Sequence, residues 1–336
     1  MHKIIFERFR QQVSKEAKKN FEKLALEIFF FQVDNNPIYR EFVQQIGQAK
    51  KHVRCLSDIP FIPVEVFRHH LVQTGLWTPE VIFRSSGTST SGRSRHAVRS
   101  LDVYHTHAIK NFEQNICRLD GIPILALLPN YIAQGDSSLV SMVNAFMQKS
   151  AHSLSGFFMD NPVTLLPTIE ACKALKRPYI LWGVSYALLD LARNHHPELG
   201  PHAMVFETGG MKGRAIELIR PELHEFLKDN FSVDRIYSEY GMTELLSQAY
   251  SLGNQLFEPA DTMRILIKEF NDPFAISAQG KPGVINVIDL ANLDTCSFIA
   301  TADIGQMTQD TSFEVLGRLD NSDLRGCNLL YTEITD

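Results

Sequence analysis

Short apolar runs alternate with longer amphipathic stretches over residues 81 to about 240, and this alternation constrains the fold more than any other feature of the chain. The apolar runs predict strands, and the stretches between them predict helices. Strands and helices that alternate in this way build a largely parallel, doubly wound α/β sheet. The strands are expected at 81–83, 122–128, 154–159, 179–182, 204–207 and 236–237, and helices between them at 101–116, 137–148 and 185–194.

The two ends of the chain differ from this middle region. Apolar residues recur at helical spacing until Asn35-Asn36-Pro37 breaks the run, which predicts a helical cap with an irregular lead-in over 1–80. Residues 256–336 hold short, β-branched runs bounded by turns, which predict antiparallel strands in a β-rich lobe with a C-terminal tail. An α/β nucleotide-binding core is expected over 81–255.

A segment rich in hydroxyls and glycine follows the first predicted strand. It reads Phe83-Arg84-Ser85-Ser86-Gly87-Thr88-Ser89-Thr90-Ser91-Gly92-Arg93-Ser94-Arg95. Glycines let backbone N–H groups approach an anion, hydroxyls add donors, and an arginine adds positive charge. No Lys-Ser or Lys-Thr pair follows the second glycine, so ordinary P-loop kinase or NTPase chemistry is disfavoured. Taken alone, the segment also fits a flexible Ser/Gly linker.

Three further motifs favour the interpretation as a phosphate-binding loop. They are Tyr240-Gly241-Met242-Thr243-Glu244, Thr301-Ala302-Asp303-Ile304-Gly305 and Gly317-Arg318-Leu319-Asp320. In this order the four segments resemble the signature motifs of the adenylate-forming superfamily, and short motifs gain force from such mutual context.

The chain is more closely similar to the LuxE-type acyl-protein synthetases of the bacterial luminescence fatty-acid reductase system. The residues that carry this likeness are Ile59-Pro60-Phe61-Ile62-Pro63-Val64, Gly209-Gly210-Met211-Lys212 and Gly326-Cys327. The likeness runs from about residue 28 to about residue 330. It implies an adenylate-forming-enzyme-like fold and the ATP-dependent activation of a fatty or related carboxylic acid to an acyl adenylate.

The resemblance also implies roles for individual residues, with ATP and Mg²⁺ as cofactors. Tyr240 would flank the adenine, and Gly241 would belong to the same nucleotide-binding motif. Thr243 would touch the α-phosphate, and Glu244 would help to hold Mg²⁺. Asp303 would accept the ribose hydroxyls, and Arg318 would reach the ribose or phosphate. The residues expected to cover the phosphates or lie against the adenine are Ser86, Gly87, Thr88, Ser89, Ser91, Gly209 and Gly210, with Arg95 or Arg93 where a lysine is usual.

Each of these motifs has a purely structural alternative. Thr243 can be the cap of a helix that starts at Glu244. Asp303 can be a turn residue ahead of Gly305, and Gly209-Gly210 can be an ordinary tight turn.

The resemblance breaks down near the C-terminus. The chain ends eleven residues after Arg325, so the mobile C-terminal domain of adenylate-forming enzymes, with its lysine, is expected to be absent. In the LuxE type the acyl group passes to a cysteine in the neighbourhood that Cys327 occupies here. A thiolate is a good acceptor for an acyl adenylate, yet many free cysteines are merely small buried apolar groups. Both interpretations of Cys327 stay open.

Composition excludes several other classes. The 33 Lys and Arg against 38 Asp and Glu give a net charge of −5, and no basic block indicates nucleic-acid binding. Nothing approaches eighteen consecutive apolar residues, so no membrane span is expected. Five cysteines without CxxC pairs indicate reduced thiols, and a cytoplasmic location is expected.

Three functions are therefore open. The leading one is acyl-adenylate formation with transfer to a protein thiol, and an acyl-CoA reductase-like enzyme or acyl carrier protein is the partner that the resemblance implies. The second is direct ligation to CoA, as in the phenylacetate-CoA ligase branch. The third is a catalytically silent nucleotide- or acyl-binding subunit of a biosynthetic complex.

Overall fold

The computed structural model describes residues 2–47, 50–85, 92–128, 135–159, 162–209, 219–309 and 311–319. One half of the molecule is a parallel sheet with five strands: β4 (Ile124–Leu127), β5 (Gly156–Phe157), β6 (Tyr179–Val184), β7 (Ala203–Thr208) and β8 (Ile236–Tyr240). They lie in the order β5-β4-β6-β7-β8. The doubly wound parallel arrangement predicted from the sequence is confirmed here.

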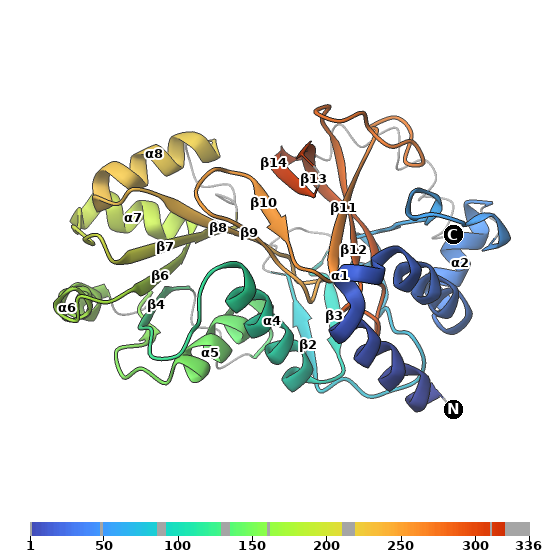
Figure 1. Cartoon of the computed structure of the whole chain (residues 1–336), viewed down its shortest axis with the longest axis horizontal. Coiled ribbons are helices and arrows are strands. Elements are labelled where there is room, and N and C mark those ends of the chain that lie inside the picture. The colour runs from blue at the N-terminus through green and yellow to red at the C-terminus, as the bar shows by residue number, and fades with distance from the viewer. Residues whose placement is uncertain are drawn as a thin grey trace.

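Helices cover both faces of this parallel half, as Figure 1 shows. They are α4 (Leu101–Asn115), α5 (Ser138–Ser150), α6 (Pro162–Ala174), α7 (Ser185–His195) and α8 (Arg220–Phe231). Side chains alternate along each strand, so Tyr179 and Leu181 pack with α6, α7 and α8, while Ile180 and Trp182 pack with α4 and α5. Because both faces are buried, β4 and β6 are apolar along most of their length.

The other half continues the same sheet and is antiparallel, apart from the short strand Ile62–Pro63, which pairs in parallel with residues 299–300. Its strands are β1 (Ile62–Pro63), β9 (Ala249–Ser251), β10 (Phe257–Pro259), β11 (Met263–Lys268), β12 (Gly283–Asp289), β13 (Phe298–Gln309) and β14 (Ser312–Arg318). The full order is β11-β12-β13-β14-β10-β9-β8-β7-β6-β4-β5, with β1 beside β13, which makes a 12-stranded sheet. The antiparallel strands predicted for the final third are confirmed. They join the parallel half where β9 turns back along β8.

Two strands stand apart from this sheet. β2 (Val81–Arg84) and β3 (Arg95–Val98) pair with each other as an antiparallel ribbon. The strand expected at 81–83 therefore exists, but it lies outside the parallel sheet, because it pairs with residues 95–98, which follow the predicted phosphate-binding loop.

The N-terminal region is helical, as expected, and packs on the antiparallel half (Figure 1). It contains α1 (His2–Asn35), α2 (Pro37–Gln45), the 3-10 turns Lys50–His52 and Leu56–Asp58, and α3 (Val66–His69). Asn36 ends the first helix and caps the second, since its side chain accepts a hydrogen bond from the Tyr39 amide. Phe29 and Tyr39 pack against Phe298 of β13, at ring-centroid distances of 6.2 and 5.9 Å. The division of the chain at residues 80 and 255 stays a prediction.

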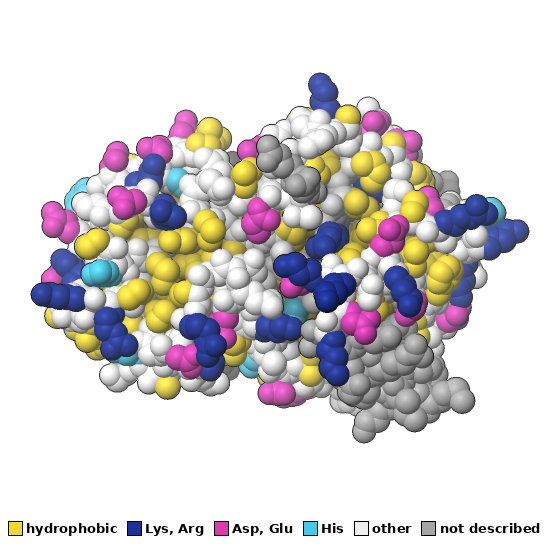
Figure 2. Space-filling view, in the orientation of Figure 1, with side chains coloured by type: hydrophobic (Ala, Val, Ile, Leu, Met, Phe, Trp, Pro, Cys, Tyr) yellow, Lys and Arg dark blue, Asp and Glu magenta, His cyan; other side chains and the backbone are white. Residues whose placement is uncertain are grey.

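The surface is mixed in charge. Figure 2 shows side chains of both signs interspersed over the face that it presents. In the part of the chain that the structure describes, no helix has both the length and the apolar character needed to cross a bilayer.

Candidate active site

Two of the predicted site residues meet where the parallel and antiparallel halves join. Tyr240 is the last residue of β8, and its hydroxyl donates a hydrogen bond of 3.0 Å to Oδ2 of Asp303 in β13. The Tyr240 ring is 7% exposed and packs edge-on against Phe313 and Phe257. Two motifs far apart in the sequence thus form one polar contact.

The third motif joins the same contact through strand register. Asp303 and Arg318 are direct cross-strand partners on β13 and β14, and Nε of Arg318 lies 3.9 Å from Oδ1 of Asp303. Burial raises the pKa of Asp303, while Arg318 and the Tyr240 hydroxyl act in the opposite direction. The Arg318 side chain is 68% exposed, so its guanidinium also faces solvent. The predicted set Tyr240, Asp303 and Arg318 is therefore brought together.

The segment after Tyr240 leaves the sheet as a turn, and no helix begins at Glu244. Glu244 is 5% exposed, and its carbonyl oxygen accepts a hydrogen bond of 2.7 Å from the Asn292 side chain. Burial raises the pKa of the Glu244 carboxyl, and the Ser94 hydroxyl and the charge of Arg318 partly offset this. Thr243 is half-buried in the same turn, and Gly241 is exposed. The helix-start alternative for Thr243 and Glu244 is wrong.

The predicted phosphate-binding loop falls outside the described residues, and with it Ser86, Gly87, Thr88, Ser89 and Ser91. Its two flanks are held together: Ser85 N–H donates to the Ser94 carbonyl at 3.2 Å, and Ser94 N–H donates to Ser85 Oγ at 3.1 Å. The loop thus leaves β2 and returns to β3 at adjacent points.

The two arginines after the loop have different surroundings. Arg93 forms an ion pair of 3.1 Å with Asp136 and donates to the carbonyls of Ser85 and Arg84. Arg95 starts β3, and its Nη2 donates to the His69 carbonyl at 3.4 Å. Because Arg93 is already engaged by a carboxylate, Arg95 is the better candidate for the position where a lysine is usual.

Gly209 follows β7 with a positive φ of 78°, a conformation that favours glycine. Its carbonyl accepts a hydrogen bond from the hydroxyl of Ser185, the first residue of α7. Gly210 and Cys327 lie outside the described residues.

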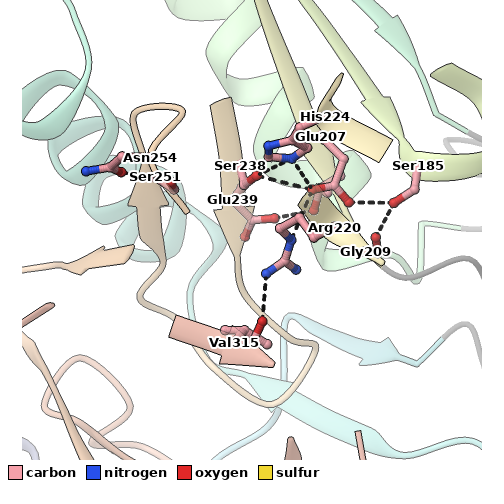
Figure 3. Close-up of polar contacts among 11 residues, drawn as sticks. Ser185, Glu207, Gly209, Arg220, His224, Ser238, Glu239, Ser251, Asn254 and Val315 are labelled. Carbon is pink, nitrogen blue, oxygen red and sulfur yellow. Dashed lines mark hydrogen bonds and ion pairs between the residues drawn. The ribbon is translucent and has the colours of Figure 1, made fainter. Parts of the chain in front are cut away.

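The sequence interpretation missed a buried acidic cluster at the carboxyl ends of β7 and β8, which Figure 3 shows. Glu207 is 2% exposed and accepts hydrogen bonds from Ser185 and Ser238. Arg220 Nε and His224 Nε2 lie 3.7 and 3.8 Å from Glu207 Oε2. Burial raises the pKa of Glu207, but His224, Arg220 and Ser185 outweigh it, so that the pKa is lowered overall.

Glu239, on the neighbouring strand, behaves differently. It is 7% exposed and accepts a hydrogen bond from the Thr208 hydroxyl, and burial raises its pKa to about 7. Acidic residues that end otherwise apolar strands, as in Val205-Phe206-Glu207, were the signal that could have identified this cluster.

Arg220 also ties the two halves of the sheet together. Its Nη1 donates to the Val315 carbonyl of β14 at 3.3 Å, and its guanidinium lies 5.1 Å from the centroid of the Phe257 ring. One side chain thus links β7 of the parallel half to the strand that carries Arg318.

No protein-family model and no curated protein sequence matches the chain. Solved structures do match its fold. An open conformation of 2-hydroxyisobutyryl-CoA ligase in complex with 2-HIB-AMP and CoA has a TM-score of 0.63 at 12% identity, over 89% of this chain and 75% of that one. ATP-bound MatB from Rhodopseudomonas palustris has a TM-score of 0.52 at 17% identity, over 70% of this chain.

O-succinylbenzoate coenzyme A synthetase (MenE) from Bacillus subtilis, in complex with ATP and magnesium ion, has a TM-score of 0.50 at 17% identity, over 70% of this chain and 49% of that one. The chain covers 47% of the MatB chain, about half its length. These likenesses show that the chain has the fold of the adenylate-forming ligases. The closer resemblance to LuxE-type acyl-protein synthetases stays a prediction.

Proposed function

We propose that the protein activates a fatty or related carboxylic acid with ATP and passes the acyl group to a protein thiol. In the first step the acid's carboxylate oxygen attacks the α-phosphorus, pyrophosphate leaves, and an acyl adenylate forms. In the second step a thiolate attacks the acyl carbonyl and AMP leaves. The observation that carries the first step is the meeting of Tyr240, Asp303 and Arg318 at one point of an adenylate-forming-ligase fold.

The residues present fit ATP and Mg²⁺. Asp303 offers acceptor oxygens for ribose hydroxyls, and the partly exposed Arg318 offers donors for the ribose or phosphate. Glu244 is a buried carboxyl whose pKa is raised by burial, an environment in which a bound cation would stabilise the charged form. Mg²⁺ usually takes only one or two carboxylates together with phosphate oxygens.

The loop from Ser86 to Ser91, with Thr243 and Arg95, would hold the phosphates. Its flanks are closed by the two hydrogen bonds between Ser85 and Ser94, so the loop would present its backbone N–H groups from a fixed base. Gly209 and Gly210 would lie against the adenine, since a glycine leaves room for a flat ring. The Mg²⁺ held by Glu244 would neutralise phosphate charge.

The acceptor thiol in this proposal is Cys327. Burial raises the pKa of Cys172 to about 11 and that of Cys296 to about 12, so these thiols are poor nucleophiles at neutral pH. Burial also raises the pKa of Cys117. The position of Cys327 in the resemblance then favours it over these three thiols. The acyl thioester would be passed to an acyl-CoA reductase-like enzyme or an acyl carrier protein.

ATP–pyrophosphate exchange over a panel of short, aromatic and long-chain acids tests the first step. Exchange that depends on one class of acid is expected. Intact-protein mass spectrometry tests the second: Cys327→Ser should keep exchange but lose the covalent acyl mass, whereas the control Cys55→Ser should keep both. If no acid supports exchange, the silent nucleotide-binding subunit becomes the better description.

Direct ligation to CoA is the second candidate, because 2-hydroxyisobutyryl-CoA ligase, whose solved structure shares this fold, is a CoA ligase by name. It predicts acyl-CoA formation when CoA is added, at a rate that Cys327→Ser does not change.

A further inference from the structure

A chain of buried hydrogen bonds connects the strand that leaves the phosphate-binding loop to the turn that carries Glu244. His96 lies in the middle of β3, and its Nε2 is 3.0 Å from both Asn292 Oδ1 and Thr295 Oγ1. Asn292 Nδ2 in turn donates to the Glu244 carbonyl at 2.7 Å. His96, Asn292 and Thr295 are each no more than 1% exposed. The connection is therefore made away from solvent.

The hydrogen bond from Asn292 to the Glu244 carbonyl fixes the direction of the other hydrogen bonds in this network. Because the Asn292 amide donates to Glu244, its carbonyl oxygen must be the atom that faces His96. The imidazole therefore carries a proton on Nε2 and donates it toward Asn292 and Thr295. Burial lowers the pKa of His96 to about 4, so the ring is neutral at pH 7. A neutral donor of this kind costs less to bury than a charged one.

The turn that contains Asn292 also forms hydrogen bonds with the segment after Glu244. Asp289 Oδ2 accepts hydrogen bonds from the amides of Leu246 and Ser247, at 2.8 and 2.9 Å. The same turn is held from behind by the N-terminal helices, since Gln32 donates to the Leu293 carbonyl at 3.0 Å and Asn36 donates to the Thr295 carbonyl at 2.8 Å. Asn292 is thus a rigid support, and what it supports is the backbone at Glu244.

We propose that His96 and Asn292 are a positioning pair that sets the Glu244 turn against the base of the phosphate-binding loop. Neither side chain needs to touch substrate. His96 lies two residues after Ser94, whose hydrogen bonds to Ser85 close the loop, and Asn292 holds the backbone whose carboxyl would bind Mg²⁺. The inference rests on the proposed role of Glu244 at the magnesium–nucleotide complex. A loop and a carboxyl that come from different segments must be held at a fixed separation to bind one ligand together.

The test compares three variants in ATP–pyrophosphate exchange. His96→Leu removes the donor, and it should raise the KM for Mg·ATP about tenfold while the KM for the acid changes less than about twofold. His96→Gln places an amide N–H near the position of Nε2, and it should restore most of the loss. Asn292→Asp keeps the acceptor for His96 but removes the donor to Glu244, so it should repeat the effect of His96→Leu and serves as the second variant if that one does not fold.

The matched control is His105→Leu. His105 likewise bonds a hydroxyl, Ser141 Oγ at 2.8 Å, but this contact joins α4 to α5 and not β3 to the Glu244 turn. If His96→Leu and His105→Leu raised the KM for Mg·ATP and the KM for the acid alike, the cause would be a general loss of packing. That result would overturn the proposal. So would an unchanged Mg·ATP KM in folded His96→Leu.

A wild-type protein that supports no exchange would count against the proposed function instead. The positioning pair is then tested by the Mg²⁺-dependent rise in melting temperature that ATP produces, which His96→Leu should lose and His96→Gln should keep. An equal rise in the wild type and in both variants would overturn it.

Discussion

The hydroxyl of Tyr240 donates a hydrogen bond of 3.0 Å to Oδ2 of Asp303, across 63 residues of sequence. This contact joins the last parallel strand to the antiparallel half. Because Asp303 also pairs with Arg318, loss of the Tyr240 hydroxyl should disturb the position of both residues in the predicted ribose site.

Tyr240→Phe should lower the free energy of unfolding by about 1 kcal/mol and raise the KM for ATP about fivefold. Urea unfolding and ATP–pyrophosphate exchange measure the two effects. Tyr39→Phe is the matched control, since the Tyr39 hydroxyl donates to the Pro60 carbonyl at 2.7 Å among the N-terminal elements. It should lose similar stability without a change in KM, and equal KM values in the two variants would contradict a role of Tyr240 in ATP binding.

Glu239→Gln should change how stability depends on pH. Burial raises the pKa of Glu239 from 4.5 to about 7, so the folded protein binds a proton that the unfolded chain releases. The contribution of Glu239 is present in full below pH 4.5 and is lost as the pH rises to about 7. Glu239→Gln removes this loss, and above pH 7 it should be more stable than the wild type by up to roughly 3 kcal/mol.

Thermal and urea unfolding between pH 4.5 and 8 check this effect. Glu170→Gln is the control, because the Glu170 carboxylate is 67% exposed beside Lys173. Its curve should follow that of the wild type. If the free energy of unfolding of Glu239→Gln depended on pH with the same slope as that of the wild type, the raised pKa would have no effect on folding.

Arg220→Met should destabilise the protein by about 3 kcal/mol at pH 7, because it leaves the buried Glu207 carboxylate without its arginine. The pKa of Glu207 is lowered in the folded state, so its stabilising contribution is present above 4.5 and is lost as the pH falls. The cost of Arg220→Met should therefore shrink in acid. Lys228→Met, which removes an ion pair with Glu225 on the same helix, should change stability by less than about 0.5 kcal/mol.

Gly305→Ala should cost about 2 kcal/mol, because a Cβ at this position of β13 would lie 2.5 Å from the Glu314 carbonyl oxygen and 2.7 Å from Ile285 Cδ1. Gly317→Ala, on the paired strand β14, meets no atom within 4 Å and should be nearly neutral. Urea unfolding compares the two. Equal stabilities would mean that β13 and β14 separate easily, contrary to the close approach described here.

Much of the fold could be predicted from local pattern. The apolar runs identified β4 and β6 over most of their length and the apolar starts of β7 and β8, because a strand that is buried on both faces is mostly apolar. The short β-branched runs of the final third identified β11, β12, β13 and β14. The placement of β2 and β3 outside the main sheet could not be predicted, since pairing partners depend on the path of the chain between strands.

The same division runs through the site. Tyr240, Asp303 and Arg318 were identified by their motifs, but their contact depends on the register of β13 against β14 and on the meeting of β8 with the antiparallel half. Glu207 and Glu239 were overlooked, and their pKa values shift in opposite directions because their surroundings differ. His224 and Arg220 lower the pKa of Glu207, whereas burial raises the pKa of Glu239.

The sequence by itself determined which segments become strands and helices and which motifs are predicted to bind a nucleotide, because periodicity and residue type are local properties. Only the tertiary structure decided that His96 reaches Glu244 through Asn292, and that one continuous sheet brings the motifs of both halves together. The reason is physical: a buried hydrogen bond or charge takes its free energy from the groups around it, and distant segments supply those groups.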